Sequence, residues 1–144
     1  MIVVDANLLL YAYDTRAAQH DASRQWLERV LSGPEFVRFA WVTIWAFLRI
    51  STNPAVFANP LSMAEAEAAV TAWFEQPRVD VLEPAERHWE ILRELLVKAQ
   101  VRGPLVMDAV LAALAIEHGA TLQTADGDFA RFPGLRWENP LREP

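Results

Sequence analysis

This 144-residue chain lacks several of the residues on which common binding sites depend. It has no cysteine, which excludes a disulfide framework and thiolate metal sites. Its formal net charge is -6, which argues against a protein that holds nucleic acid by bulk positive charge. No glycine-rich phosphate-binding loop is present, and Lys98 is the only lysine. Any contact with a polyanion therefore depends on a local basic patch.

Long hydrophobic runs are also absent. The uncharged apolar segments are well short of the ~20 residues needed to cross a bilayer, and no signal-peptide pattern opens the sequence. We therefore expect a cytoplasmic protein with no membrane contact. Hydrophobic residues make up 53% of the chain, which is enough for a sizeable core, so we expect residues 1–144 to form a single domain.

Hydrophobic spacing predicts strands that alternate with helices. The expected strands cover residues 1–5, 36–39, 78–82, 120–123 and, at an edge, 135–137. The expected helices cover residues 7–13, 20–31, 41–50, 62–75, 85–100 and 105–116, and a capping box of Ser62 and Glu65 opens the fourth of them. We predict an α/β fold of three layers, with a mostly parallel sheet of four to five strands between helices.

The apolar stripes of the helices predict which side chains face the core. Trp41, Ile44, Trp45 and Leu48 follow the i, i+3, i+4, i+7 pattern, which predicts that they form one buried stripe. We assign most of the six tryptophans to the core or to a subunit contact. The other side chains expected to face inward on their helices are Leu8, Leu9, Tyr11, Ala12, Trp26, Leu27, Val30, Leu31, Trp89, Leu92 and Leu96.

One acid stands in the most apolar helix. The segment 105–116 is apolar except for Asp108. A helix that is apolar all round is buried, and a buried carboxylate costs several kcal/mol unless it is paired or bound to a metal. The alternative is an acid near a helix N-terminus, one turn after Pro104, which is favourable by about 0.3–1 kcal/mol. No counter-charge occupies the neighbouring helical positions, which favours a functional site at Asp108.

Other aspartates follow predicted strands. Asp5 ends the first strand, where it could cap the following helix, although Asn7 could cap it equally well. Asp126 and Asp128 flank a glycine just after Thr124, an arrangement that alone is typical of a turn. Because ligands of parallel sheets bind beyond the carboxyl ends of the strands, Asp5 and Asp126 together with Asp108 predict a metal site.

The chemistry of these acids points to a hard cation. Carboxylates brought together raise one another's pKa unless a divalent ion neutralises them. Oxygen-only ligands favour Mg²⁺ or Mn²⁺ over zinc, and the three histidines do not fall at metal-ligand spacing. Such sites are a common means of hydrolysing phosphodiesters.

At its two ends the chain resembles the PIN-domain ribonucleases. The segments are MIVVDANLLLYAYD and MDAVLAALAIEHGATLQTADGDFARFPGL, and together with WAFLRISTNP and HWEILREL they resemble the VapC toxins of toxin–antitoxin pairs. The resemblance implies a PIN-like fold and catalytic, metal-binding roles for Asp5, Asp108 and Asp126. It makes Asp128 a further metal ligand or water-orienting group, and it places Asn7 and Thr124 beside the metal.

The third expected helix departs from the family pattern. Many relatives carry a glutamate where this chain has Ala46, which removes one acid from the site. Arg49 follows at i+3 and so lies on the same face, where a guanidinium could contact an RNA phosphate or form an ordinary ion pair.

The resemblance therefore implies a Mg²⁺-dependent endoribonuclease toxin, with Mn²⁺ as a substitute. Its substrate would be structured RNA of the tRNA or rRNA class, its inhibitor a VapB-type antitoxin, and its working form a homodimer. Ala46 keeps open a non-catalytic PIN-like module that binds RNA or protein. A phosphatase or phospho-acceptor domain is the third reading, but it calls for a lysine near the phosphate, and the spacing turns Lys98 towards solvent.

Overall fold

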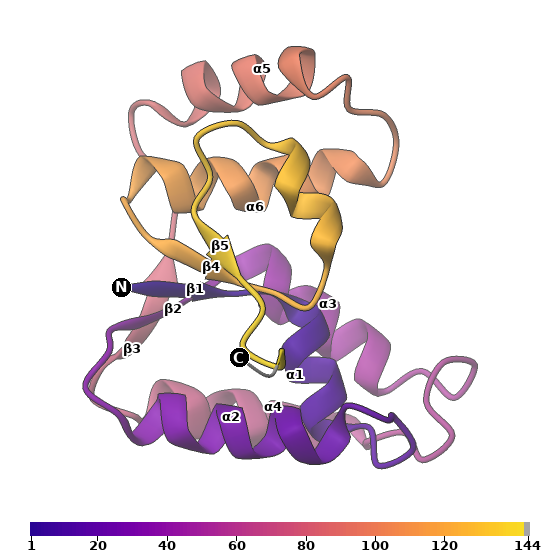
Figure 1. Cartoon of the computed structure of the whole chain (residues 1–144). Helices are drawn as coiled ribbons and strands as arrows, with labels where there is room; N and C mark the ends of the chain where they lie inside the picture. Colours follow the sequence, from indigo (N-terminus) through magenta and orange to yellow (C-terminus); the bar gives the residue numbers. More distant parts are fainter. Residues whose placement is uncertain (143–144) are drawn as a thin grey trace.

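The computed structural model describes residues 1–142, which form an α/β/α sandwich around one parallel sheet (Figure 1). The strands are β1 (Ile2–Val4), β2 (Val37–Ala40), β3 (Val79–Leu82), β4 (Thr121–Gln123) and β5 (Trp137–Glu138), in the spatial order β3-β2-β1-β4-β5. The helices are α1 (Ala6–Tyr13), α2 (His20–Ser32), α3 (Trp41–Ser51), α4 (Met63–Phe74), α5 (His88–Lys98), α6 (Leu105–Glu117) and the 3-10 helix η1 (Gly127–Arg131). The predicted three-layer fold is confirmed, and all pairings between adjacent strands are parallel.

The central strand β1 divides its side chains between two cores. Ile2 and Val4 belong to one buried cluster and Val3 to the other, as the alternation of a strand requires. All three residues are buried because helices cover both faces of the sheet. The first core also contains the inward sides of α1, α2, α3 and α4, which contribute Leu8, Leu9, Trp26, Phe47 and Trp73.

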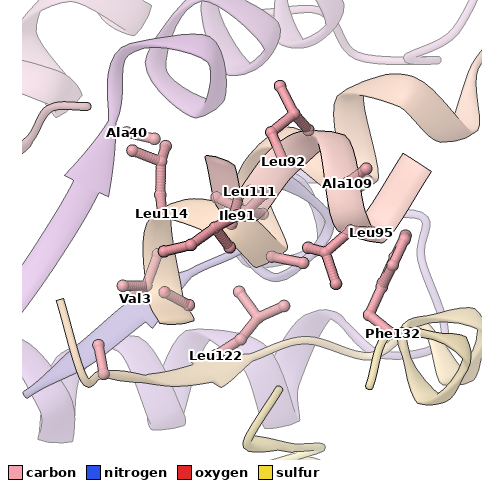
Figure 2. Close-up of a cluster of buried hydrophobic side chains, with 14 of the residues drawn as sticks. Val3, Ala40, Ile91, Leu92, Leu95, Ala109, Leu111, Leu114, Leu122 and Phe132 are labelled. Atoms are coloured by element: carbon pink, nitrogen blue, oxygen red, sulfur yellow. The ribbon is translucent and has the colours of Figure 1, made fainter. Parts of the chain in front are cut away.

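The second core surrounds α6, which lies between the sheet and α5 (Figure 1). Figure 2 shows Leu111 and Leu114 of α6 among Ile91 and Leu92 of α5 and Val3 of the sheet. Because α6 packs against the sheet on one side and against α5 on the other, it is apolar nearly all round. Its first turn projects beyond the packing, and Val106 and Met107 are exposed there.

The strand order places a crevice beside the end of β1. The chain adds β2 and then β3 on one side of β1, and adds β4 and then β5 on the other. The order therefore reverses between β1 and β4, and parallel α/β sheets bind ligands at such a switch point, beyond the carboxyl ends of the strands. Asp5 and Thr124, which directly follow these two strands, both lie there.

The prediction for the third helix is wrong in its orientation. Trp41 and Trp45 are 41% and 59% exposed, and the buried side of α3 consists of Thr43, Ile44, Phe47 and Ser51. Strand β2 runs into α3 without a loop, since Ala40 ends the strand and caps the helix, so the strand sets the rotation of the helix. Apolar residues on both sides of α3 hid this rotation from the pattern.

Other predictions need smaller corrections. The helix expected over 85–100 is the shorter α5, and its Trp89, expected inside, is 66% exposed. The last strand begins at Trp137 rather than at residue 135. Lys98 faces solvent as expected and lies 3.7 Å from Glu94. Within residues 1–142, no helix is long and apolar enough to cross a membrane.

The predicted capping box of α4 is confirmed and gives a test of the fold. The Ser62 side chain accepts a hydrogen bond from the Glu65 backbone at 3.1 Å, and Glu65 accepts one from the Ser62 backbone at 3.0 Å. Ser62→Ala removes the cap without opening a cavity, so we expect the free energy of unfolding to fall by about 1 kcal/mol in urea denaturation. Thr71→Ala, exposed on the same helix, serves as the control; an equal loss there would contradict the role of the cap.

Candidate active site

A cleft of about 540 Å³ opens beside the end of β1, between α3 and the first turn of α6. Its lining includes Asp5 from the β1–α1 junction, Trp45 and Arg49 from α3, and Met107 and Asp108 from α6. Segments that are far apart in the sequence thus converge at the switch point of the sheet. Two of the predicted site acids, Asp5 and Asp108, therefore line the same cleft.

Asp5 directly follows β1 and caps α1. Its Oδ1 accepts a hydrogen bond from the Ala6 backbone at 2.7 Å, and its Oδ2 accepts one from the Thr124 hydroxyl at 2.7 Å. Burial raises the pKa of this carboxyl, the two hydrogen bonds oppose that rise, and the charge of Asp126 adds to it. Asp5 is therefore both the cap and a site acid, whereas Asn7 lies inside the helix and does not cap it.

The Thr124 hydroxyl joins the parts of the site. It donates to Asp5 and accepts hydrogen bonds from Asn7 Nδ2 at 3.2 Å and from the Asp126 backbone at 3.0 Å. The Asn7 amide oxygen accepts a further bond from the Ala125 backbone at 3.3 Å. Thr124 is fully buried. Its hydroxyl donates one hydrogen bond and accepts two, so all of its hydrogen-bonding capacity is satisfied within the protein. The two polar residues expected beside the metal thus fix the acid at the end of β1.

Asp108 lies in the first turn of α6 and faces the cleft. Burial and then the charges of Asp5, Asp126 and Asp128 raise its pKa to about 6, while the charge of Arg131 acts in the opposite direction. The favourable field of a helix N-terminus does not outweigh these effects. Asp108 is therefore held in a position where its ionised form is disfavoured, which is common at functional sites.

Asp126 and Asp128 occupy the turn after β4. The Asp126 carboxylate caps η1 by accepting a hydrogen bond from the Asp128 backbone at 2.8 Å, so the turn interpretation is correct as well. The charge of Asp126 reaches both Asp5 and Asp108. Asp128 is exposed, and its charge raises the pKa of Asp108. The turn thus places both acids where their charges act on Asp108, although neither lines the cleft.

The donor set suits an oxygen-preferring divalent cation. Asp5, Asp108 and Asp126 supply only carboxylate oxygens, the ligand type of Mg²⁺ and Mn²⁺, and a cation would relieve the repulsion that raises the pKa of Asp108. Within the described residues, no group of three or more histidine, aspartate or glutamate side chains is arranged so that it could hold a metal ion. His20 and His118 contact the Tyr11 and Glu83 carbonyls instead.

The α3 side of the cleft carries no acid. Ala46 lines it at the position where the family resemblance led us to expect a glutamate, and Arg49 lines it one turn further on. Arg49 is exposed, and within residues 1–142 it takes part in none of the salt bridges. The ion-pair alternative for this guanidinium therefore finds no support in the structure.

Sequence reasoning missed three residues at the site. Trp45 and Met107 line the cleft, although Trp45 was expected in the core. Arg131, at the end of η1, donates from Nε to the Asp128 carbonyl at 3.2 Å, and its charge reaches Asp108. Trp45 lies four residues before Arg49, a spacing that would have placed both side chains on one side of α3.

Comparisons with known proteins agree with this architecture. A model of the PIN domain family matches residues 2–135. The chain is 43% identical over 140 residues to ribonuclease VapC37 of Mycobacterium tuberculosis, covering 97% of each protein. It is 41% identical over 143 residues to ribonuclease VapC33 of the same species, covering 99% of this chain and 100% of the relative.

Solved structures share the fold. The Rickettsia felis VapBC2 complex, bound to a DNA fragment from its promoter, contains a chain that superposes with a TM-score of 0.69 at 18% identity, over 96% of this chain and 98% of that one. The sarcin-ricin-loop-cleaving toxin VapC20 of Mycobacterium tuberculosis gives a TM-score of 0.67 at 20% identity, over 94% and 99% of the two chains. From the family match and the two close relatives, we conclude that the chain belongs to the PIN-domain family, among its VapC ribonucleases.

Proposed function

We propose that this protein is a Mg²⁺-dependent endoribonuclease toxin that hydrolyses phosphodiester bonds in structured RNA, with Mn²⁺ able to replace Mg²⁺. The observation that carries the proposal is the electrostatic coupling of three acids from separate elements, two of which, Asp5 and Asp108, line one cleft. Asp5 follows β1, Asp108 lies in the first turn of α6 and Asp126 follows β4, and the charges of Asp5 and Asp126 both act on Asp108. A purely structural role would leave this repulsion uncompensated.

In this proposal, Asp5, Asp108 and Asp126 hold the cation and Asp128 assists from the rim. The bound ion supplies a water of lowered pKa and neutralises charge on the phosphate. Thr124 and Asn7 hold the Asp5 carboxylate in one orientation through the hydroxyl bond of 2.7 Å. Arg49 contacts an RNA phosphate from the α3 side, since guanidinium groups match phosphate oxygens in pairs.

Substrate class and inhibitor follow from relatives and are part of the proposal. VapC20 cleaves the sarcin-ricin loop, and VapBC complexes share this fold. We therefore infer a tRNA or rRNA substrate in the cytoplasm and a VapB-type antitoxin as the inhibitor. A homodimer is inferred from the family resemblance alone.

A second function deserves a test because Ala46 lines the cleft in place of an acid. A PIN-like module that binds RNA or protein without cleaving it would retain the fold and lose the chemistry. The two functions differ in one measurement. Mapping new 5′ ends after incubation of total RNA with the protein and Mn²⁺ gives discrete cuts for the nuclease and none for the binding module.

The metal site predicts a thermal shift. With Mg²⁺ at about ten times its Kd, linkage adds about 1.4 kcal/mol of stability, or about 4 °C in Tm. Asp108→Asn abolishes this shift and lowers RNA cleavage by at least about 100-fold, while its circular dichroism spectrum stays that of the wild type. NaCl at equal ionic strength is the control. A Mg²⁺ shift that survives undiminished in Asp108→Asn would exclude the proposed site.

The raised pKa of Asp108 predicts a pH-dependent stability in metal-free buffer. Because the folded state holds this proton up to about pH 6 and the unfolded chain releases it near pH 4, the free energy of unfolding falls as the pH rises through this window. Asp108→Asn is therefore more stable than the wild type above pH 6, by about 1 kcal/mol after screening of this partly exposed group.

Below about pH 4, the protonated Asp108 of the wild type and the asparagine of the variant are both neutral. The difference in the free energy of unfolding between the two proteins therefore disappears. Urea denaturation across this range measures it. Glu67→Gln, which changes one exposed charge on α4, is the matched control. A constant difference between Asp108→Asn and the wild type at every pH would show that the titration of this carboxyl is not its cause.

Restoring an acid at position 46 tests the missing ligand. Ala46 lines the cleft on the same side as Arg49, so Ala46→Glu adds a carboxylate to the donor set. We expect tighter Mg²⁺ binding, by about tenfold, and lower stability without metal because another negative charge faces Asp108. Isothermal titration measures the affinity, and Ala46→Gln, of equal size without the charge, should leave it unchanged.

A further inference from the structure

Two exposed indole rings stack at the edge of the carboxylate cleft. Trp41 and Trp45, one helical turn apart on α3, have ring centroids 6.4 Å apart and an interplanar angle of 19°. Trp45 is 59% exposed and lines the cleft together with Asp5 and Asp108. A rigid aromatic surface left in solvent beside a reactive site is typical of a ligand-binding surface.

Trp41 supports the Trp45 ring from outside the cleft. The Trp41 Nε1 donates to Glu83 Oε1 at 3.3 Å, and the ring packs on Phe74 with centroids 6.3 Å apart. One indole is thus fixed to the body of the protein, and the other stacks on it. Trp45 therefore keeps a defined orientation although most of its surface is in solvent.

The surroundings of Trp45 indicate what it binds. Met107 and Leu111 extend the apolar wall, and Ala46 leaves room beside the ring that a longer side chain would fill. Arg49, four residues after Trp45, adds a cation on the same side of the helix. A flat apolar surface next to a guanidinium matches a nucleotide, which has a base with a π-face and a phosphate. A volume of 540 Å³ is in the range of small-ligand sites.

We propose that Trp45 is the stacking platform for an unpaired base of the RNA substrate, with Arg49 on the neighbouring phosphate. This inference rests on the proposed ribonuclease function and narrows its substrate class. Bases within a duplex are covered on both faces by their neighbours, so they are not available to the indole. The cleft therefore selects nucleotides in loops, bulges or single strands, where bases can leave the stack. Stacking on one aromatic ring strengthens binding by about tenfold and tolerates any base.

Fluorescence anisotropy with three RNA probes tests this platform. The probes are a short single-stranded oligoadenylate, the same ribose-phosphate chain without bases, and a short blunt-ended duplex. Ca²⁺ replaces Mg²⁺, and gel electrophoresis checks that the RNA stays intact. We expect Trp45→Ala to weaken oligoadenylate binding about tenfold and to leave the affinity for the abasic chain and the duplex unchanged. Trp45→Tyr, which keeps a π-face, restores most of the loss.

Two further variants make the experiment specific. Trp89→Ala removes an indole that is 66% exposed on α5 and outside the cleft, and it should change none of the affinities. Arg49→Ala should weaken binding of all three probes alike and reduce the salt dependence of binding. Circular dichroism of Trp45→Ala should match that of the wild type, because the side chain is mostly exposed.

Three outcomes would overturn the platform. The first is unchanged oligoadenylate binding by Trp45→Ala while the wild type still cleaves RNA, which removes the platform and leaves the nuclease. The second is an equal loss for the abasic chain, or dissociation of a dimer in sedimentation, which makes Trp45 a structural or subunit contact. The third is a wild type that neither binds nor cleaves RNA, which defeats the proposed function and the platform with it.

Discussion

The hydrogen bond from the buried Thr124 hydroxyl to Asp5 is the contact around which the site is assembled. It joins the ends of the two strands that flank the switch point, β1 and β4, and the same oxygen accepts bonds from Asn7 and the Asp126 backbone. A carboxylate this buried needs donors on its oxygens, and Thr124 and the Ala6 backbone provide them. Because the hydroxyl has a single proton, donating it to Asp5 also fixes which partners can donate to Thr124. The orientation of the first acid and the path of the chain after β4 are therefore set together.

Asp108 is held close to other carboxylates although their negative charges disfavour its ionised form. Asp108 is held by α6, whose later turns are packed between the sheet and α5 (Figure 2), so its backbone position relative to Asp5 and Asp126 is fixed. Packing energy from buried leucines and alanines, about 25 cal/mol per Å² of apolar surface, keeps in place a group whose ionised form is disfavoured. The packed later turns of α6 thus fix the position of its first turn, which carries Asp108. Loss of local stability at such a site is a common consequence of function.

The features that could be predicted from the sequence are those in which one residue differs sharply in polarity from its neighbours in the chain. A lone Asp108 in an apolar helix, strands ending at Asp5 and before Asp126, and the Ser62 capping box are all local signals, and all lie where they were expected. The rotation of α3 was missed because apolar residues occupy both of its sides, so periodicity alone could not choose between Trp45 and Phe47. That choice depends on how β2 enters the helix at Ala40, which is a tertiary fact. Likewise, the hydrogen bonds that Thr124 makes with Asp5 and Asn7 join residues more than a hundred positions apart, beyond the reach of local patterns.

The residue at position 46 affects the charge balance of the cleft. Each carboxylate facing Asp108 raises its pKa further, as Asp5, Asp126 and Asp128 already do, so a glutamate on α3 would add repulsion that only a bound cation could relieve. Alanine at that position limits this repulsion and leaves an apolar wall instead. An apolar wall cannot bind a metal, but it lowers the local dielectric and so strengthens the attraction between the remaining carboxylates and a cation. In the proposed function, the α3 side of the cleft therefore offers aromatic surface and one guanidinium to the RNA rather than a ligand to the metal.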